Sequence, residues 1–254
     1  MKNLFAAALA LSFLVGMTGC QKTLTSVEKK SVTMKALYAG VPVTVDGRLE
    51  ESVWKNAQEY TFDIPGDMAP NGEAIRESGQ VRLAWDDRYF YVGIQCEDSD
   101  LVAEGKKDEL RHFELGDLFE LFLKPDNQSW YWELYVTPRG KKTSFFFPGC
   151  GRFGLPGCMD YQSGMKVAAQ CQGTLDNWRD KDTGWTAEMA VPIKDLTAEG
   201  DAFGPGQKWR ILVARYNYSR YFDAPRGPEY SMTPKLSQTN FHLLPEYAYL
   251  ELIK

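Results

Sequence analysis

Histidine and positive charge are both scarce in this sequence. Only two of its 254 residues are histidine, His112 and His242, so the chain cannot supply a three-histidine metal site. Because histidine is the usual base at neutral pH, hydrolytic mechanisms that need one are disfavoured, whereas chemistry by paired carboxylates stays open. The 34 acidic residues outnumber the 29 basic ones, and the net charge of -5 argues against a nucleic-acid partner, because neutralising phosphates requires a basic surface.

Long hydrophobic runs are also missing, with one exception at the N-terminus. A run from Leu4 to Val15, apolar except for Ser12, follows Lys2 and is too short for the roughly 20 residues of a membrane-spanning helix. A basic start, a short apolar core and a small-residue end are typical of a secretory signal peptide. The composition, 44% hydrophobic and 25% charged, excludes a disordered chain and a multi-span membrane protein.

The signal segment ends in Met17-Thr18-Gly19-Cys20, which resembles a bacterial lipobox. In such a motif the cysteine is acylated and becomes the first residue of the mature protein. We therefore expect residues 1–20 to be a lipoprotein signal peptide, Cys20 to carry the lipid, and residues 21–38 to be a tether. The protein would then contact the membrane through its lipid anchor only, in the cell envelope on the outer membrane, facing the periplasm or the outside. An ordinary signal peptide with an incidental cysteine is the alternative.

Four cysteines follow Cys20, and export would place this even set in an oxidising compartment where disulfides form. Cys150 and Cys158 bracket a glycine-rich loop, so they are the favoured pair. Cys96 and Cys171 would pair only if their strands are neighbours. A four-thiolate zinc site is the alternative, but no C-x-x-C spacing supports it.

Aromatic residues are abundant (7 Trp, 13 Tyr and 14 Phe), and apolar side chains recur at every second position. This alternation predicts strands with one buried face. It is found in about nine segments: 80–85, 89–96, 119–123, 130–136, 143–147, 165–171, 185–191, 209–213 and 248–252. Short helical turns are expected only at Glu50–Ala57 and Ile193–Leu196. The sequence therefore predicts an all-β fold, an antiparallel β-sandwich in a single domain over residues 39–254.

Several separated motifs resemble those of family 9 carbohydrate-binding modules. The segment Val45–Trp54 is similar to the family's opening DGxLDExxW element, and Val81–Val92 is similar to its VRxxWDDxYLYV hairpin. Further matches follow in the family's order, at Asp117–Leu123, Tyr131–Gly140, Gly184–Pro192 and Phe241–Leu252. The resemblance implies a jelly-roll-like sandwich that binds sugars at the end of a glycan chain, with structural calcium and without catalysis.

The resemblance also implies which residues contact a sugar. The family holds its terminal sugar between two tryptophan rings, of which the first aligns near His112 and Phe113 and the second on Phe241. Glu120 aligns with a carboxylate that binds hydroxyl groups, and Tyr135 stands where the family has an arginine. Aromatic rings suit the apolar face of a pyranose, and carboxylates suit its hydroxyls. For Phe241 the alternative is core packing, and for Glu120 it is a surface ion pair.

Two further candidates come from composition. The segment 215–223 is rich in Arg and Tyr, which suits a polar ligand, so Arg215 and Tyr218 are candidate sugar contacts. Packing of this loop on its own aromatic rings is the alternative. A short acidic cluster offers oxygen ligands for calcium, with a solvated strand end as the alternative: Glu97, Asp98 and Asp100.

The leading functional hypothesis is a non-catalytic lipoprotein that captures glycan chain ends for polysaccharide breakdown and uptake. Its expected partners are poly- or oligosaccharides and glycan-degrading enzymes of the same envelope. Binding requires no cofactor, and structural calcium is the one ion under consideration. A carboxylate-dependent glycoside hydrolase, with Glu120 paired to Glu133 or Asp117, is the first alternative. A surface-assembly or interaction domain with a degenerate sugar site is the second.

Overall fold

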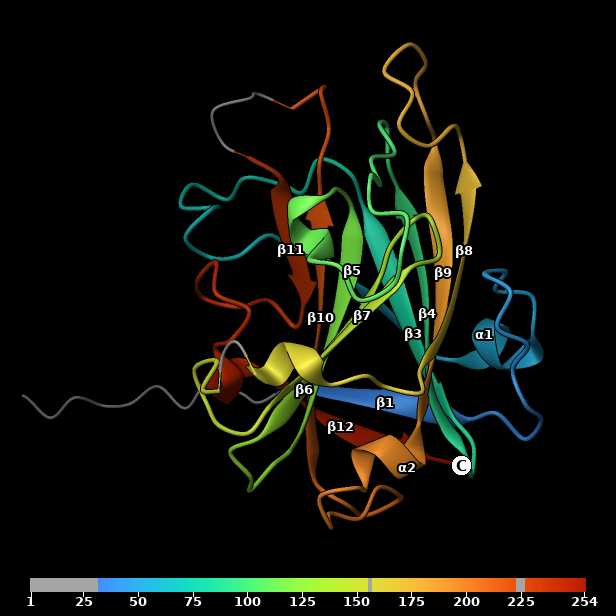
Figure 1. Ribbon diagram of the computed structural model, residues 1–254, viewed down its shortest axis with the longest axis vertical. Helices are drawn as coiled ribbons and strands as arrows, with labels where there is room; N and C mark the ends of the chain where they lie inside the picture. Colours follow the sequence, from blue (N-terminus) through green and yellow to red (C-terminus); the bar gives the residue numbers. More distant parts are fainter. Residues whose placement is uncertain (1–31, 155–156, 223–226) are drawn as a thin grey trace, which may run out of the picture. The chain divides into compact units, whose positions relative to one another are not determined.

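The computed structural model describes residues 32–154, 157–222 and 227–254 (Figure 1). These residues form one compact unit. The predicted signal peptide, the predicted lipidation site Cys20 and residues 21–31 of the predicted tether lie outside the described residues. Within the part that is described, no helix has the length and apolar character needed to cross a membrane.

Twelve strands and two short α-helices make up the described part of the chain. In order, they are β1 (Thr33–Tyr38), α1 (Ser52–Asn56), β2 (Glu59–Thr61), β3 (Gly79–Trp85), β4 (Tyr89–Glu97), β5 (Leu118–Pro125), β6 (Tyr131–Val136), β7 (Lys142–Phe147), β8 (Lys166–Gln172), β9 (Gly184–Pro192), α2 (Ile193–Leu196), β10 (Trp209–Asn217), β11 (Glu229–Thr233) and β12 (Ala248–Ile253). Short 3-10 helices lie between them at η1 (His112–Glu114), η2 (Gly157–Asp160) and η4 (Leu244–Glu246). Both helices lie where short helical turns were expected.

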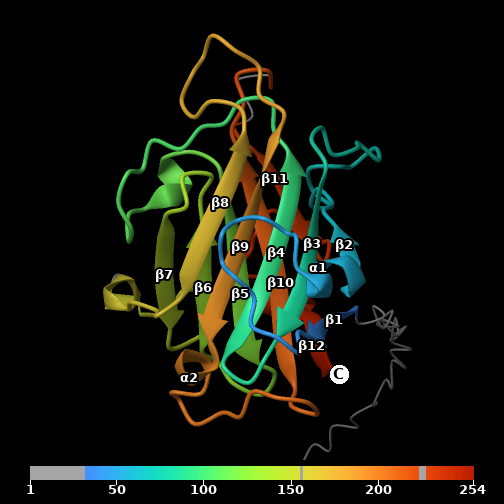
Figure 2. The same ribbon diagram turned by 90° about the vertical axis from the view of Figure 1, so that its right-hand side faces the viewer.

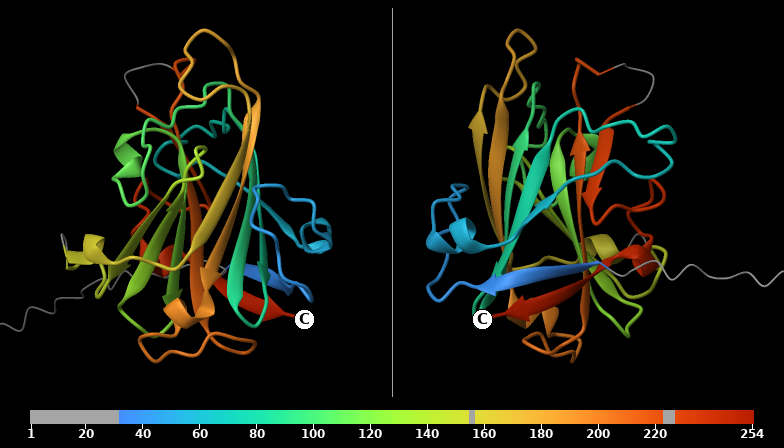
Figure 3. Two further views of the ribbon diagram at one scale, coloured as in Figure 1. Left: turned by 45° about the vertical axis from the view of Figure 1, so that its right-hand side comes forward. Right: turned by 180° about the vertical axis from the view of Figure 1, so that it is seen from behind.

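The strands pack as two layers that are joined at one end (Figures 1 and 2). One layer has the order β7-β6-β5-β10-β11, and the other has the order β8-β9-β4-β3-β2. The pair β1 and β12 crosses between them, because β12 pairs with β10 while β1 pairs with β3 (Figure 3). The predicted all-β, jelly-roll-like sandwich is confirmed, with twelve strands rather than about nine.

The strands that the alternation does not predict are β1, β2 and β11. β1 lies within the segment predicted as a tether. The alternation does not reveal it because only two of its side chains, Met34 and Ala36, are fully buried. The tether prediction is therefore wrong for residues 33–38, and the folded domain begins at β1 rather than at residue 39. The antiparallel prediction is also wrong for this strand, which runs parallel to both β12 and β3.

The main hydrophobic core fills the space between the two layers. Strands of both layers contribute to it, with Leu121 from β5 and Ile211 from β10 on one side and Val92 from β4 and Met189 from β9 on the other. Four tryptophans belong to this core: Trp85, Trp132, Trp185 and Trp209. Burial of these large side chains removes apolar surface from water, at about 25 cal/mol per Å², and is the main term that stabilises the sandwich.

The cysteines do not pair as predicted, and all four described cysteines are free. Cys150 and Cys158 are both among these free cysteines, so the predicted Cys150–Cys158 disulfide is wrong. Cys96 on β4 and Cys171 on β8 lie on either side of β9, where Trp185 stands in register between them. Because their strands are not neighbours, the condition for a Cys96–Cys171 pair is not met.

Candidate functional site

A second hydrophobic cluster covers the outer face of the β7-β6-β5-β10-β11 layer. On β5, for example, Phe119 and Leu121 point into the main core, whereas Leu118 and Phe122 point into this outer cluster. Loop side chains complete the cluster: Cys158, Leu236, Phe241, Leu244 and Tyr247. The layer is therefore buried on both faces, and polar side chains on its outer face lie under loops rather than in bulk water.

A cavity of about 240 Å³ opens within this outer face. The strands place five side chains in it: Glu120 from β5, Glu133 and Tyr135 from β6, Tyr216 from β10 and Tyr230 from β11. Loops add the rest of the lining: Phe113, Arg152, Thr239, Asn240, Phe241 and His242. Because β5, β6, β10 and β11 are paired in one sheet, the first set is held in a defined spacing, while the loops set the shape of the mouth.

Aromatic rings form much of the cavity wall. The rings of Tyr216, Tyr230 and Phe241 meet edge to face, with centroids 4.8 to 5.9 Å apart. Phe113 stands edge-on to Tyr135 at 6.5 Å. Such rings offer both a flat apolar surface and, in the tyrosines, hydroxyl groups at its margin. The combination of a small aromatic cavity and a few placed polar groups is typical of a small-molecule site.

Two carboxyl groups are buried in the same cavity, with Glu120 only 2% and Glu133 only 5% exposed. Burial raises the pKa of Glu133 to about 7, although a hydrogen bond from the Tyr135 hydroxyl lowers it in part. Burial also raises the pKa of Glu120 well above its usual range, and the neighbouring charge of Glu133 adds to this effect. The cavity therefore holds carboxyl groups that retain protons near neutral pH.

His242 stands beside this pair and is uncharged at neutral pH. Its Nδ1 lies 2.8 Å from the Tyr131 hydroxyl, and its Nε2 lies 3.7 Å from Glu133 Oε2, beyond hydrogen-bond distance. Burial lowers the pKa of His242 to about 4. Glu133 Oε2 is buried without a hydrogen-bond partner, so one acceptor in the cavity is left for a ligand to satisfy.

We predict that the Glu133→Gln variant changes the pH dependence of stability. A carboxyl whose pKa rises from 4.5 in the unfolded chain to about 7 in the folded protein stabilises the fold below pH 4.5, and this contribution is lost as the pH rises toward 7. Relative to the wild type, the variant should therefore gain stability between pH 5 and 7, by up to about 1.4 kcal/mol per pH unit. Urea unfolding at several pH values measures this difference, in which the contribution of His242 cancels.

Glu97→Gln is the matched control, because it removes one negative charge outside the cavity. If the difference in free energy of unfolding between the wild type and Glu133→Gln stays constant from pH 5 to 7, the shifted titration of Glu133 is contradicted.

The structure brings together four of the residues predicted to contact a sugar: Phe113, Glu120, Tyr135 and Phe241. Two others are close but do not line the cavity. His112 is buried and packs near Gly105. The Tyr218 hydroxyl donates to the carbonyl of Phe113 (2.8 Å), so it supports the cavity wall instead of forming it.

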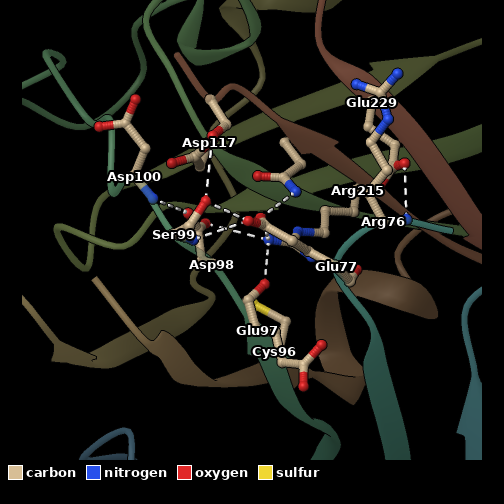
Figure 4. A network of polar contacts seen from close by, with 12 residues as sticks. Arg76, Glu77, Cys96, Glu97, Asp98, Ser99, Asp100, Asp117, Arg215 and Glu229 are labelled. Carbon is tan, nitrogen blue, oxygen red and sulfur yellow. Dashed lines mark hydrogen bonds and ion pairs between the residues drawn. The ribbon is translucent and has the colours of Figure 1, made fainter. Parts of the chain in front are cut away.

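Arg215 lies away from the cavity, and its prediction as a sugar contact is wrong. It neighbours Tyr216 on β10, so alternation turns it to the opposite face, into the interior. There its guanidinium donates to Asp98 (3.1 Å) and to the carbonyls of Glu77 (3.1 Å) and Glu97 (2.7 Å), as Figure 4 shows. Arg215 is thus the centre of a buried ionic network within the sandwich.

The predicted calcium site at Glu97, Asp98 and Asp100 is also wrong. Asp98 pairs with Arg215 (Figure 4). Asp100 pairs with Arg220, and a carboxylate oxygen of Glu97 accepts from Ser78. Because alternation and the turn after β4 send the three side chains to different partners, their oxygens do not converge. Within residues 32–154, 157–222 and 227–254, no three His, Cys, Asp or Glu side chains are arranged to hold a metal ion.

The sequence did not predict several cavity residues. Tyr216 and Tyr230 lie on β10 and β11, and the alternation of Tyr216 with Arg215 was an available signal for the former. Glu133 shares the outer face of β6 with Tyr135, and the sequence predicted it only as the partner of Glu120 in the hydrolase alternative, not as a sugar contact. Arg152 and the segment 239–242 come from loops, where no periodic signal exists.

The chain also matches a known protein family. The model of the carbohydrate family 9 binding domain-like family matches residues 45–206, more than half of the sequence. The chain belongs to this family. The resemblance found in the sequence motifs is thereby confirmed.

Solved structures share the fold of this family member. A putative carbohydrate-binding protein from Bacteroides uniformis ATCC 8492 is similar over 88% of this chain and 100% of its own, with a TM-score of 0.67 and 13% identity. A family 9 carbohydrate-binding module from Caldicellulosiruptor kristjanssonii, in complex with cellotriose, matches 87% of this chain and 93% of its own, with a TM-score of 0.57 and 14% identity. Its complex with glucose gives a TM-score of 0.56. At such low identity these likenesses show the fold alone. No match was found among curated proteins.

Proposed function

We propose that this family member binds glycans in the cavity on the outer face of the sandwich and does not cleave them. The observation that supports this proposal is the convergence of Phe113, Glu120, Tyr135 and Phe241 on one cavity. Rings of this kind stack on the apolar face of a pyranose, and buried carboxyl groups bond to its hydroxyls. The solved family 9 module that holds cellotriose and glucose has the same fold, which adds support.

The size of the cavity points to the end of a glycan chain. Small-molecule sites are usually on the order of 300 to 1,000 Å³, and this cavity of about 240 Å³ lies below that range. One sugar residue is therefore the largest unit that we expect it to enclose, and the rest of a chain would extend into solvent. Captured chain ends would then be passed to glycan-degrading enzymes and uptake systems.

A glycan array followed by isothermal titration calorimetry tests this function. We expect weak binding to a sugar, with a monosaccharide bound about as tightly as the oligosaccharide that ends in it, because only the terminal residue is enclosed. Absence of binding to every plant and microbial saccharide tested would overturn the proposal. Affinity that rises steeply with chain length would contradict the chain-end mode and favour an extended groove.

We further propose that Cys20 carries a lipid that anchors the protein to the outer membrane. The support is the apolar run from Leu4 to Val15 followed by Met17-Thr18-Gly19-Cys20. We expect the wild type to incorporate labelled palmitate and to fractionate with membranes, whereas Cys20→Ala should lose the label and appear in the soluble fraction. Cys150→Ala, which removes an exposed cysteine of the folded domain, is the control. Retention of the label by Cys20→Ala would show that Cys20 is not its site.

Glycan hydrolysis is a second candidate function, favoured by one observation: Glu120 and Glu133 line the same cavity. Glycosidases place two carboxyl groups across the scissile bond, one of them protonated through a raised pKa. Asp117 does not qualify as the partner, because its buried carboxylate accepts from the backbone N–H groups of Val102 and Tyr218. Release of reducing sugar that Glu120→Gln abolishes would establish hydrolysis, and no release from a glycan that binds would refute it.

A further inference from the structure

The cavity has buried acidic groups, and among the described residues that line it there is no buried cation. Glu120 and Glu133 are almost completely buried, and Glu133 Oε2 has no hydrogen-bond partner. Of the described residues that line the cavity, only Arg152 carries a positive charge at neutral pH, and it is exposed. Two acidic groups without a buried counter-charge are costly to ionise, so they stay protonated in part unless a cationic ligand supplies that charge.

The aromatic wall fits the same kind of ligand. The edge-to-face cluster of Tyr216, Tyr230 and Phe241 surrounds part of the cavity, and Phe113 adds a further ring. Aromatic faces carry partial negative charge and attract ammonium groups, most strongly where water is excluded. Buried carboxyl groups and aromatic faces together are what a compact organic cation requires.

We propose that the cavity recognises a protonated amine, and that its ligand class is therefore a non-acetylated amino sugar at a glycan end. This inference rests on the proposed function, and it names the sugar that the same cavity selects. An ammonium group would donate to the unpartnered Glu133 Oε2 and to Glu120, while the sugar ring packs on the aromatic wall. An N-acetyl group would remove the charge, and a uronate would place a third acidic group in the cavity.

Binding of such a ligand should release a proton. In the free protein, burial raises the pKa of both carboxyl groups, so the pair retains at least one proton near pH 7. A bound ammonium favours ionised carboxylates, and the displaced proton leaves to solvent without any covalent change. The other titratable or charged groups around the pair are these: Tyr131, Tyr135, Tyr216, Tyr218, Tyr230, Tyr247, Cys158, Arg152 and His242. Among them Arg152 is the one cation, and it lies at the exposed mouth.

The test is calorimetric titration of the full chain at pH 7 with glucosamine, glucose, N-acetylglucosamine and glucuronate. We expect glucosamine to bind at least about 10-fold more tightly than glucose, and neither of the other two to bind more tightly than glucose. Titrations in phosphate and in MOPS, whose heats of protonation differ, should show proton release with glucosamine and none with glucose. The comparison of ligands needs only the wild-type protein, so it does not depend on whether a variant folds.

The Glu133→Gln variant tests whether Glu133 causes the preference for glucosamine. It should reduce the preference for glucosamine over glucose to within about 2-fold while glucose still binds, and Glu97→Gln should leave the preference unchanged. Equal affinity for glucose and glucosamine, or tighter binding of glucuronate, would overturn the inference and leave the proposed glycan function standing. If none of these sugars nor any array glycan binds, the proposed function fails and the inference with it.

Discussion

Asp98→Ala is expected to destabilise the protein by about 3–5 kcal/mol, because it removes the nearer carboxylate partner of the buried Arg215 guanidinium and leaves Glu77 at 3.9 Å. Both side chains are almost fully inaccessible, and their ion pair is 3.1 Å long. Asp98 also accepts a hydrogen bond from the Trp185 indole (3.2 Å), which the substitution would leave without that partner. Urea unfolding at pH 7 measures the loss.

Removing both charges should lower the stability of the protein far less than removing one. The double variant Asp98→Leu with Arg215→Met replaces the pair by apolar groups of similar size, and we expect it to recover most of the stability lost in Asp98→Ala. Glu251→Ala is the surface control, because Glu251 pairs with Lys35 at 3.9 Å with both side chains about half exposed; it should cost less than about 1 kcal/mol. A loss below 1 kcal/mol for Asp98→Ala would show that Arg215 does not depend on this partner.

Phe113→Ala is expected to weaken glycan binding by about 10-fold to 100-fold with little change in stability. Phe113 lines the cavity from η1 and is only partly buried, so its ring is available to a ligand. Loss of one such aromatic contact at a binding site typically costs about 1–3 kcal/mol. Titration with the best-binding sugar measures the affinity, and thermal unfolding measures the stability.

Phe241→Ala, unlike Phe113→Ala, should lower stability as well as affinity. Phe241 is buried against Phe122, Tyr216 and Tyr230, so its removal should lower both affinity and stability, the latter by about 3–5 kcal/mol. Trp178→Ala is the control, since Trp178 is 72% exposed and lies outside the cavity. Unchanged sugar affinity in Phe113→Ala, or a loss equal to that in Trp178→Ala, would place the binding site elsewhere.

Strands could be predicted from the sequence where buried and exposed side chains alternate over many residues. β4 has nine residues and β9 has nine, and in both the buried positions recur clearly enough to identify the segment. β1 and β2 are shorter, and their buried faces hold at most two side chains. Their identity as strands depends on partners that are distant in the chain, as β1 shows by pairing with β12. Local sequence carries no information on that pairing.

The cavity was predictable only in part, for a related reason. Glu120 and Tyr135 were predicted from the family resemblance, and they lie on one face because their strands are neighbours and the two residues stand in register. Arg215 shows the limit of such reasoning: the composition of its segment suited a ligand, but alternation on β10 turned it inward and Tyr216 outward. Loop residues such as Arg152 and His242 reach the cavity because of the path of the chain over the outer face.

The sequence by itself determined the class of fold, the family and four of the residues that meet in the cavity. Periodicity and short motifs are local properties, so one chain is enough to read them. Only the tertiary structure decided that the outer face is covered, that Glu133 joins Glu120 there, and that Arg215 and Asp98 are partners in the interior. Those outcomes depend on which face of each strand the loops cover and on desolvation of the groups beneath them, and burial of charge is a property of the whole fold.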